Sequence, residues 1–382
     1  MPPASTTSPA RLALIAVLAL CGALNGVTLL WLLLRQPHFN ADFLGFWSYP
    51  RFAPLAQIYD PQAMARFQQA LYPGFKSFYP FTYPPDFLLV TGWMRDFSLG
   101  AARDIWTVTG LAAFLAAGLA LFRGRPLPVV ALLASPAALL SLVAGQTGFF
   151  AGALLLGGLA WLPSSPVLAG IAFGLLTLKP QMGLLLAVLL LARGAWRAIA
   201  AASLTALALA ALSCALLPPE LWRLWLHSLP QIQRDYFAGG VNLNVMITPA
   251  ANLAHLGVPV RLLGATQGVC TLAVITVMAL IARRAEYSLA VAALLAGTFL
   301  AQPHAYAYDA VTLPAALALC APPRPAPWQL ALAAAVYLSP LLLLTPADGW
   351  FLYAPLLAVL FGAIAAAPRA NSLLTRRGES QT

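Results

Sequence analysis

Long apolar runs make up most of this chain, and they restrict it to folds that are built inside a lipid bilayer. Of its 382 residues, 61% are hydrophobic and only 8% are charged, and the mean hydropathy is +0.82. A soluble domain carries about 25% charged residues, so no soluble fold fits this composition. We therefore expect an all-α polytopic membrane protein in which residues 1–382 form a single integral domain.

The apolar runs are twelve in number, and several are shorter than a bilayer requires. A hydrocarbon core about 30 Å thick needs roughly 20 helical residues, whereas several runs contain only 12 to 16. The short runs form pairs around the polar tips GQTG (145–148), KPQ (179–181) and QPHAYAYD (302–309). Paired short helices of this kind indicate an internal polar chamber. The runs occupy residues 12–34, 105–122, 127–143, 148–162, 166–178, 181–192, 197–217, 258–282, 287–301, 306–320, 328–345 and 350–367.

The distribution of charge assigns each loop to a side of the membrane. If the N-terminus is cytoplasmic and the twelve runs alternate, the cytoplasmic side holds eleven arginines and only Glu286 and Glu379 as acids. The outer side then holds ten cations and nine acids. This asymmetry satisfies the positive-inside rule, and it explains the net charge of +10 without nucleic-acid binding. The arginines are Arg11, Arg123, Arg125, Arg193, Arg197, Arg283, Arg284, Arg324, Arg369, Arg376 and Arg377.

Two long external loops, 35–104 and 218–257, and a cytoplasmic tail, 368–382, follow from this topology. Segment 83–97 is treated as re-entrant or interfacial, because counting it as a span would invert every later assignment. The three polar tips then share the outer face with the two long loops. Polar residues from distant parts of the sequence are therefore expected to gather on one side of the membrane.

The first external loop contains an amphipathic segment, DPQAMARFQQALYPGF, at residues 60–75. A helix here would lie in the plane of the membrane interface, either beside a functional site or as a simple surface anchor. At helical spacing, Met64, Phe67 and Leu71 share one face, and Arg66, Gln68 and Gln69 lie on other faces.

Asp42 is the candidate catalytic residue. It lies among aromatic and small apolar residues in FNADFLGFW (39–47), where desolvation raises the proton affinity of a carboxylate. Such a carboxylate suits a general base that takes a proton from an attacking hydroxyl. The alternative role is a helix N-cap, since Asp is a favoured capping residue.

Residues at the polar tips are candidate ligands of a phosphorylated donor. Lys179 has no carboxylate close in sequence, so we expect it either to bind phosphate or to extend its amine to the interface. His304 is able to donate a hydrogen bond to phosphate or to shuttle a proton, although a single histidine is often structural. Gln146 suits a sugar hydroxyl and helix packing equally well, and Gln181 belongs to the same donor-binding set.

Further polar and aromatic residues are candidate contacts to a sugar or an acceptor. The second external loop contains LPQIQRDYFAGGVNLNVMITP (229–249). Its aromatic and amide side chains are typical of polar ligand sites and also of irregular loops at a membrane edge. The candidate residues are Trp47, Tyr83, Asp86, Arg234, Tyr236, Asn242, Asn244 and Tyr308.

Several common signatures of catalytic and metal sites do not occur in the sequence, including DxD, HxxxH, Walker and GxSxG patterns. With only eight Asp and three Glu, a cage of carboxylates for a divalent metal is hard to assemble. The four cysteines all fall within apolar runs and are interpreted as small buried hydrophobic residues. We expect metal-independent chemistry with no cofactor.

Several short motifs follow one another in the order ADF (41–43), IYDP (58–61), FTYPP (81–85), AGQTG (144–148), LKPQ (178–181) and QPHAYAYD (302–309). This order resembles glycosyltransferase family 87, which includes polyprenol-phosphate-mannose-dependent α-1,2-mannosyltransferases. The resemblance covers about residues 40 to 310. It implies a C-type glycosyltransferase fold with about 12 transmembrane helices and with amphipathic helices in the first external loop. It also implies that Asp42 is the catalytic residue and that Lys179 and His304 bind phosphate.

The resemblance further implies an inverting transfer of a sugar, mannose-like or a pentose, from a polyprenyl-phosphate donor. The acceptor would be a hydroxyl of a lipid-linked or glycan molecule. The Ala-rich composition, with Arg favoured over Lys, suggests a bacterium, which would place the site on the periplasmic side of the inner membrane. Asp86, in YPPDF, stands where the family pattern has an apolar or small residue, so it is a second candidate for the base.

A flippase or transporter of lipids or polyprenyl-phosphate sugars is the main rival hypothesis. Broken helices with polar tips also occur in transporters. The sequence shows no convincing internal repeat, however, and its cytoplasmic segments are poor in acids and aromatic residues. A purely structural scaffold would not need polar groups on one face. The sequence therefore favours the glycosyltransferase.

Overall fold

The computed structural model describes residues 9–34, 41–73, 79–237, 246–344 and 353–367. Within these ranges the chain forms helices and no strand, and an isolated antiparallel bridge joins Met246 to Tyr306. The prediction of an all-α protein is confirmed.

Most of the helices correspond to the apolar runs of the sequence, several of which are divided by a break, and the others lie within residues 35–104 and 218–257. Short 3-10 helices, labelled η, occupy many of the breaks. The α-helices are α1 (Pro9–Leu34), α2 (Ala41–Ser48), α3 (Pro61–Leu71), α4 (Phe87–Thr91), α5 (Leu99–Leu121), α6 (Pro126–Leu133), α7 (Pro136–Ala144), α8 (Gly148–Trp161), α9 (Pro166–Leu175), α10 (Leu184–Ala192), α11 (Trp196–Leu216), α12 (Glu220–Phe237), α13 (Pro249–His255), α14 (Val260–Arg284), α15 (Tyr287–Ala301), α16 (Leu313–Cys320), α17 (Pro327–Leu338) and α18 (Tyr353–Ala366). The 3-10 helices are η1 (Tyr49–Arg51), η2 (Leu55–Gln57), η3 (Gly92–Asp96), η4 (Leu176–Leu178), η5 (Pro180–Gly183), η7 (Ala307–Thr312) and η8 (Ser339–Leu344).

Four of the described helices, α1, α5, α11 and α14, are long and apolar enough to cross a membrane. The bent pair α6 and α7 raises this number to five if the pair is one span. The expected number of twelve spans is not confirmed, because the remaining apolar helices contain 10 to 17 residues. Helices of that length need protein or a polar cavity around their ends.

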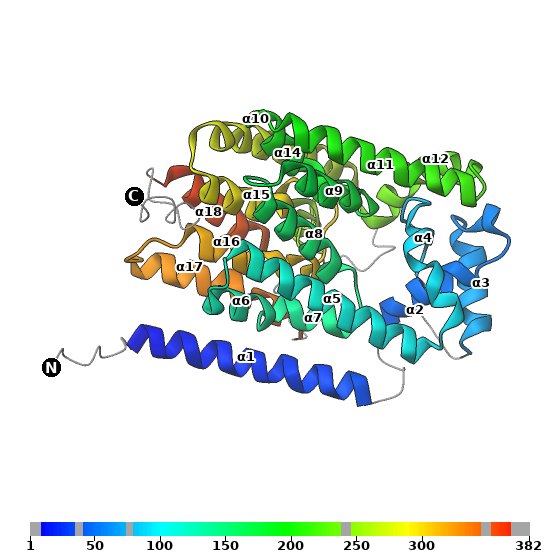
Figure 1. The fold of residues 1–382 in the computed structure, drawn as a ribbon, viewed down its shortest axis with the longest axis horizontal. Helices are drawn as coiled ribbons and strands as arrows, with labels where there is room; N and C mark the ends of the chain where they lie inside the picture. The colour runs from blue at the N-terminus through cyan, green and yellow to red at the C-terminus, as the bar shows by residue number, and fades with distance from the viewer. Residues whose placement is uncertain (1–8, 35–40, 74–78, 238–245, 345–352, 368–382) are drawn as a thin grey trace.

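Helices α2, α3 and α4 gather at one end of the molecule, on the right in Figure 1, beside the N-terminal end of α5 and close to α12. Residues 83–97 contain α4 and η3, which have five residues each and are too short to cross a bilayer alone. Whether this segment enters the membrane, and whether the loop is external, stay predictions.

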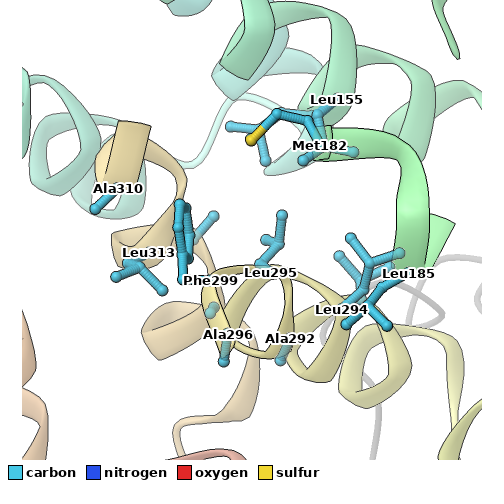
Figure 2. Packing of buried hydrophobic residues seen from close by; sticks show 14 of the residues in the cluster. Leu155, Met182, Leu185, Ala292, Leu294, Leu295, Ala296, Phe299, Ala310 and Leu313 are labelled. Atoms are coloured by element: carbon cyan, nitrogen blue, oxygen red, sulfur yellow. The ribbon is translucent and has the colours of Figure 1, made fainter. Parts of the chain in front are cut away.

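The centre of the fold is α15, in which every residue from Ala290 to Ala301 is buried. A helix that is apolar on all sides belongs inside a bundle. Figure 2 shows Leu295 and Phe299 of this helix in the cluster that contains Leu155 of α8 and Met182 of η5. This packing fixes the ends of α8, α10 and α15 relative to one another.

A second cluster, rich in aromatic residues, holds α2 in place. The ring centroid of Phe46 lies 5.7 Å from those of Tyr83 and Trp106 and 5.6 Å from that of Phe87. Aromatic pairs at these distances contribute about 0.5–1.5 kcal/mol each beyond the burial of their area. Phe46 therefore anchors the helix that carries Asp42 one turn earlier.

Helix α3 is amphipathic, but one of its residues is not where the sequence pattern placed it. Gln68, expected away from the apolar face, is fully buried. Its amide nitrogen donates to Ser48 Oγ and to the carbonyl of Tyr79, each at 3.0 Å, and its amide oxygen accepts from the Tyr79 N–H at 2.8 Å. The expectation for Gln68 was wrong because Gln68 is four residues after Met64 and therefore lies on the same buried face of the helix. The hydrogen bonds offset the cost of burying its amide.

Helices α9 and α11 pack closely through two glycines one turn apart on α9. A Cβ on Gly170 would lie 2.6 Å from the Ala201 Cβ, and a Cβ on Gly174 would lie 2.6 Å from the Ala202 carbonyl oxygen. Such small residues let helix backbones approach each other inside a membrane.

We predict that Gly170→Ala and Gly174→Ala each lower the free energy of unfolding by about 1–3 kcal/mol, because the added methyl overpacks the contact. Gly268→Ala on α14 is the matched control, since its Cβ would meet nothing within 4 Å, and it should gain up to about 1 kcal/mol of helix propensity. Equilibrium unfolding in mixed detergent micelles measures all three. Equal stability of the three variants would contradict the close contact.

Candidate active site

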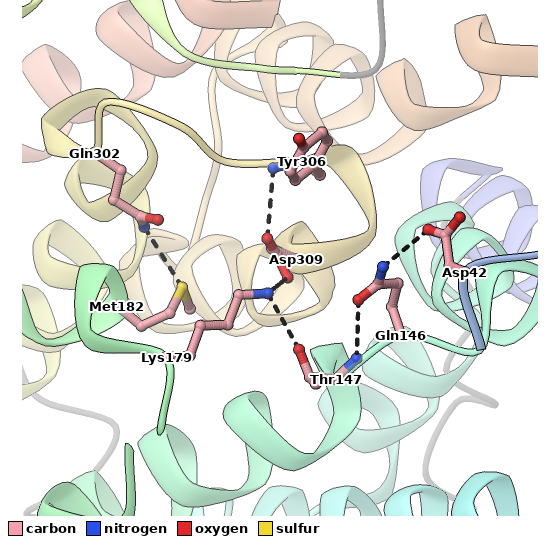
Figure 3. A network of polar contacts seen from close by, with 8 residues as sticks. All are labelled: Asp42, Gln146, Thr147, Lys179, Met182, Gln302, Tyr306 and Asp309. Atoms are coloured by element: carbon pink, nitrogen blue, oxygen red, sulfur yellow. Dashed lines mark hydrogen bonds and ion pairs between the residues drawn. The ribbon is translucent and has the colours of Figure 1, made fainter. Parts of the chain in front are cut away.

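A chain of polar contacts joins residues from four distant segments (Figure 3). Gln146, in the break between α7 and α8, donates from Nε2 to Asp42 Oδ2 at 2.8 Å. Its oxygen accepts from the Thr147 N–H at 3.4 Å, and Thr147 Oγ1 accepts from Lys179 Nζ at 3.2 Å. Lys179 is also ion-paired with Asp309. The structure therefore brings Asp42 together with residues of all three polar tips that the sequence predicted to share one side: Gln146 and Thr147, Lys179, and Asp309.

Asp42 lies in the first turn of α2 and is partly exposed. Burial raises the pKa of its carboxyl, while hydrogen bonds from Gln146 and Tyr79 lower it. These opposing effects keep the carboxylate available as a proton acceptor with a higher affinity than a free aspartate. Its two side-chain partners come from outside α2, so the carboxylate does more than cap its own helix.

Tyr79 is a site residue that the sequence analysis missed. Its phenol is hydrogen-bonded to Asp42, and its backbone is held from both sides by the buried Gln68. A Cβ on Gly45 would lie 2.9 Å from the Tyr79 Cβ, so the glycine in α2 allows this close approach. The Tyr-Pro pair at 79–80 repeats the Tyr-Pro pair at 83–84, and that repeat was the available signal.

Lys179 occupies the break between η4 and η5, and its anion partner, Asp309, is 130 residues away in the sequence. Both side chains are buried. The lysine amine has three donors, and Asp309 and Thr147 use two of them. The ring of Tyr308 lies 5.6 Å from the same nitrogen. Within the described residues, one N–H therefore stays available for a ligand, on an amine held in place by the ion pair.

His304 lies in the turn between α15 and η7 and is partly buried. Burial, together with the positive charge of Lys179, lowers the pKa of its imidazole to about 4. At neutral pH the ring is uncharged, so it offers an N–H donor without adding a second cation. Gln181 is partly buried in η5, next to the lysine turn.

Asp86 stands apart from this polar chain. It is 2% exposed, and its Oδ1 has no hydrogen-bond partner among the described residues. Burial raises the pKa of its carboxyl to about 6, although hydrogen bonds that the carboxyl accepts from its own backbone N–H and from that of Phe87 lower the pKa. The two candidate bases therefore differ in environment, since Asp42 belongs to the polar chain and Asp86 is buried outside it.

The other sugar- and acceptor-binding candidates are divided between the site and its surroundings. Tyr308 stacks on Tyr306 at 5.0 Å beside Lys179, whereas Tyr83 stacks on Phe87 at 4.0 Å within the aromatic cluster.

The indole of Trp47 donates to the Phe97 carbonyl and is covered by the Arg51 guanidinium. Arg234 is exposed on α12 and donates to Gln231. Tyr236 belongs to the last turn of α12, where the structure describes the backbone and not the side chain. Asn242 and Asn244 lie outside the described residues.

Across the described ranges, His, Cys, Asp and Glu side chains do not gather in groups of three or more. The expectation of metal-independent chemistry stays a prediction, which chelation of the purified protein tests.

We predict that Asp309→Asn lowers the free energy of unfolding by about 3–5 kcal/mol, because it leaves the buried Lys179 charge unpaired. The double variant Lys179→Met/Asp309→Leu should recover most of that loss, since no charge is left buried. The control is Glu220→Gln, which breaks the exposed pair of Glu220 with Arg223 and should cost less than about 1 kcal/mol. Equilibrium unfolding in mixed micelles measures the series, and a double variant as unstable as Asp309→Asn would argue against the ion pair.

Comparison with known proteins assigns the chain to a family. No curated protein and no solved structure matches the chain. The family model for glycosyltransferase family 87 matches residues 81–303, more than half of the sequence. The match includes Gln146 and Lys179 and leaves Asp42, His304 and Asp309 outside its limits. The chain belongs to glycosyltransferase family 87.

Proposed function

We propose that this glycosyltransferase moves a sugar from a polyprenyl-phosphate donor to a hydroxyl of a lipid-linked or glycan acceptor, with inversion at the anomeric carbon. The observation that carries the proposal is the polar chain itself, in which a carboxylate and a buried amine lie at opposite ends of linked hydrogen bonds. A displacement reaction needs both groups. One accepts the proton of the nucleophile, and the other stabilises the group that leaves.

The chemical steps assign one role to each end. The Asp42 carboxylate accepts the proton of the acceptor hydroxyl as its oxygen forms a bond to the anomeric carbon. The bond from that carbon to the phosphate oxygen breaks on the opposite face, and polyprenyl phosphate leaves with the electron pair. A single displacement of this kind inverts the anomeric configuration.

The charge at Lys179 suits the leaving group better than the bound donor. The donor is a phosphodiester with one negative charge, and the leaving group is a phosphomonoester that gains a second charge as the bond breaks. The remaining N–H of Lys179 and the neutral imidazole of His304 are donors held in place before the reaction. Preorganised donors aimed at developing charge lower the barrier to reaction.

The membrane supplies the setting for a lipid-linked donor. Helices α1, α5, α11 and α14 are apolar along their length, and many of their leucines are exposed, among them Leu20, Leu119, Leu207 and Leu272. The charge pattern of the sequence favours the outer, periplasmic side of a bacterial inner membrane for the polar chain. On this proposal the lipid tail stays in the bilayer while the sugar enters the site.

We predict that Asp42→Asn lowers kcat at least about a hundredfold, because general-base catalysis typically contributes that much, while binding of the donor is retained. The assay uses purified protein in nanodiscs with a panel of radiolabelled polyprenyl-phosphate sugars, with and without a chelator.

Asp86→Asn is the matched control and should keep most of the activity. Full activity in Asp42→Asn with activity lost in Asp86→Asn would move the base to Asp86. Saturable donor binding without transfer to any acceptor would favour a flippase instead. Loss of activity on chelation would overturn the metal-independent mechanism.

We also predict that Tyr79→Phe moves the acidic limb of the kcat/KM profile to higher pH. The Tyr79 hydrogen bond lowers the pKa of Asp42, so its removal raises that pKa further, and a base must be deprotonated to act. Tyr59→Phe is the control, since the Tyr59 phenol donates to the Tyr83 carbonyl instead. An acidic limb that is unchanged in Tyr79→Phe would show that Tyr79 does not tune the base.

A further inference from the structure

A cavity of about 700 Å³ opens at the far end of the same helices that carry the polar chain. Lys179 precedes α10 and Arg193 follows it, while Tyr287 begins α15 and Gln302 follows that helix. Arg193 and Tyr287 both line the cavity. At about 1.5 Å per residue, α15 separates the cavity from the polar chain by roughly 20 Å. The cavity is therefore distinct from the candidate active site.

Three arginines line this cavity: Arg123 after α5, and Arg193 and Arg197 around the turn from α10 to α11. None of them takes part in an ion pair among the described residues. Arg193 donates to the Ala285 carbonyl at 2.7 Å and lies over the Tyr287 ring at 5.6 Å. The cavity thus concentrates positive charge without a carboxylate on its wall.

The rest of the wall is apolar. Leu121, Leu159 and Leu162 line it, and Trp196, which is 65% exposed, lies at the start of α11 beside the arginines. Exposed tryptophan beside arginine is typical of the level where lipid headgroups meet the hydrocarbon core. The cavity therefore offers charged donors and an apolar surface to one ligand.

We propose that this cavity binds the headgroup of an anionic phospholipid, separately from the sugar donor and independently of the transfer reaction. The arginines donate to the phosphate oxygens, for which the planar guanidinium is suited. The leucines contact the first methylenes of an acyl chain. Inorganic phosphate carries the same charge chemistry but cannot use the apolar wall, so the lipid is the occupant that fits both parts.

The test measures binding of short-chain phosphatidylglycerol to the full chain in neutral detergent by native mass spectrometry. Phosphatidylcholine with the same acyl chains and inorganic phosphate are the comparison ligands. We expect phosphatidylglycerol to bind at least about tenfold more tightly than phosphatidylcholine. The variant Arg123→Gln/Arg197→Gln should weaken phosphatidylglycerol binding by about 25-fold, at roughly fivefold per arginine, and leave phosphatidylcholine binding unchanged.

Arg283→Gln/Arg284→Gln is the matched control, because it removes two exposed arginines at the end of α14 that do not line the cavity. An equal loss in this control would attribute binding to diffuse charge and overturn the site. Equal affinity for the two lipids, or displacement of the lipid by an equal concentration of inorganic phosphate, would overturn it as well. If the double variant does not fold, Arg197→Lys replaces it, and an affinity equal to that of the wild type would argue against recognition by the guanidinium.

Discussion

The buried ion pair between Lys179 and Asp309 is the interaction on which the arrangement of the site depends. Each partner lies in a helix break, η4–η5 for the lysine and η7 for the aspartate. Broken backbone inside a membrane protein is tolerated where it is surrounded by protein or lines a polar cavity. Thr147 adds the break between α7 and α8 to the same point. The polar side chains of three helix breaks therefore pair with one another, and this pairing holds the three breaks in one place.

Much of this arrangement could be predicted from the sequence. High hydropathy identifies the membrane helices, and the short polar segments between them stand out against it. The helical class followed from such local patterns, and the charge asymmetry placed Asp42 and the GQTG tip on the same side without predicting their contact. Asp309 entered the sequence analysis only as the last residue of the QPHAYAYD tip, and its pairing with Lys179 was not predicted. That pairing joins residues 130 positions apart, and no periodicity relates them. Tyr79 was missed for a similar reason, since its role depends on contacts between a loop and two short helices.

The two candidate bases show how environment separates residues of the same type. Asp86 is enclosed beside the aromatic cluster and is 2% exposed, so its raised pKa reflects burial without access for a hydroxyl. Asp42 also has a raised pKa, but it is partly exposed and is oriented by Gln146 and Tyr79. A general base must reach the proton that it takes. Access and orientation, more than the direction of the pKa shift, therefore favour Asp42.

The same helices connect two chemically different ends. The ends of α8, α10 and α15 that meet near Lys179 carry hydrogen-bonded and ion-paired groups, whereas their opposite ends border a cavity with three arginines that lack ion-pair partners in the described structure. Short helices bring these ends to within roughly 20 Å of each other, less than the hydrocarbon thickness of about 30 Å. The bilayer around the bundle must then be thinner than usual, or polar groups of the protein must lie deeper in the membrane than the lipid headgroups. An anionic headgroup drawn in by the arginines would satisfy that requirement at one end, as the polar chain does at the other.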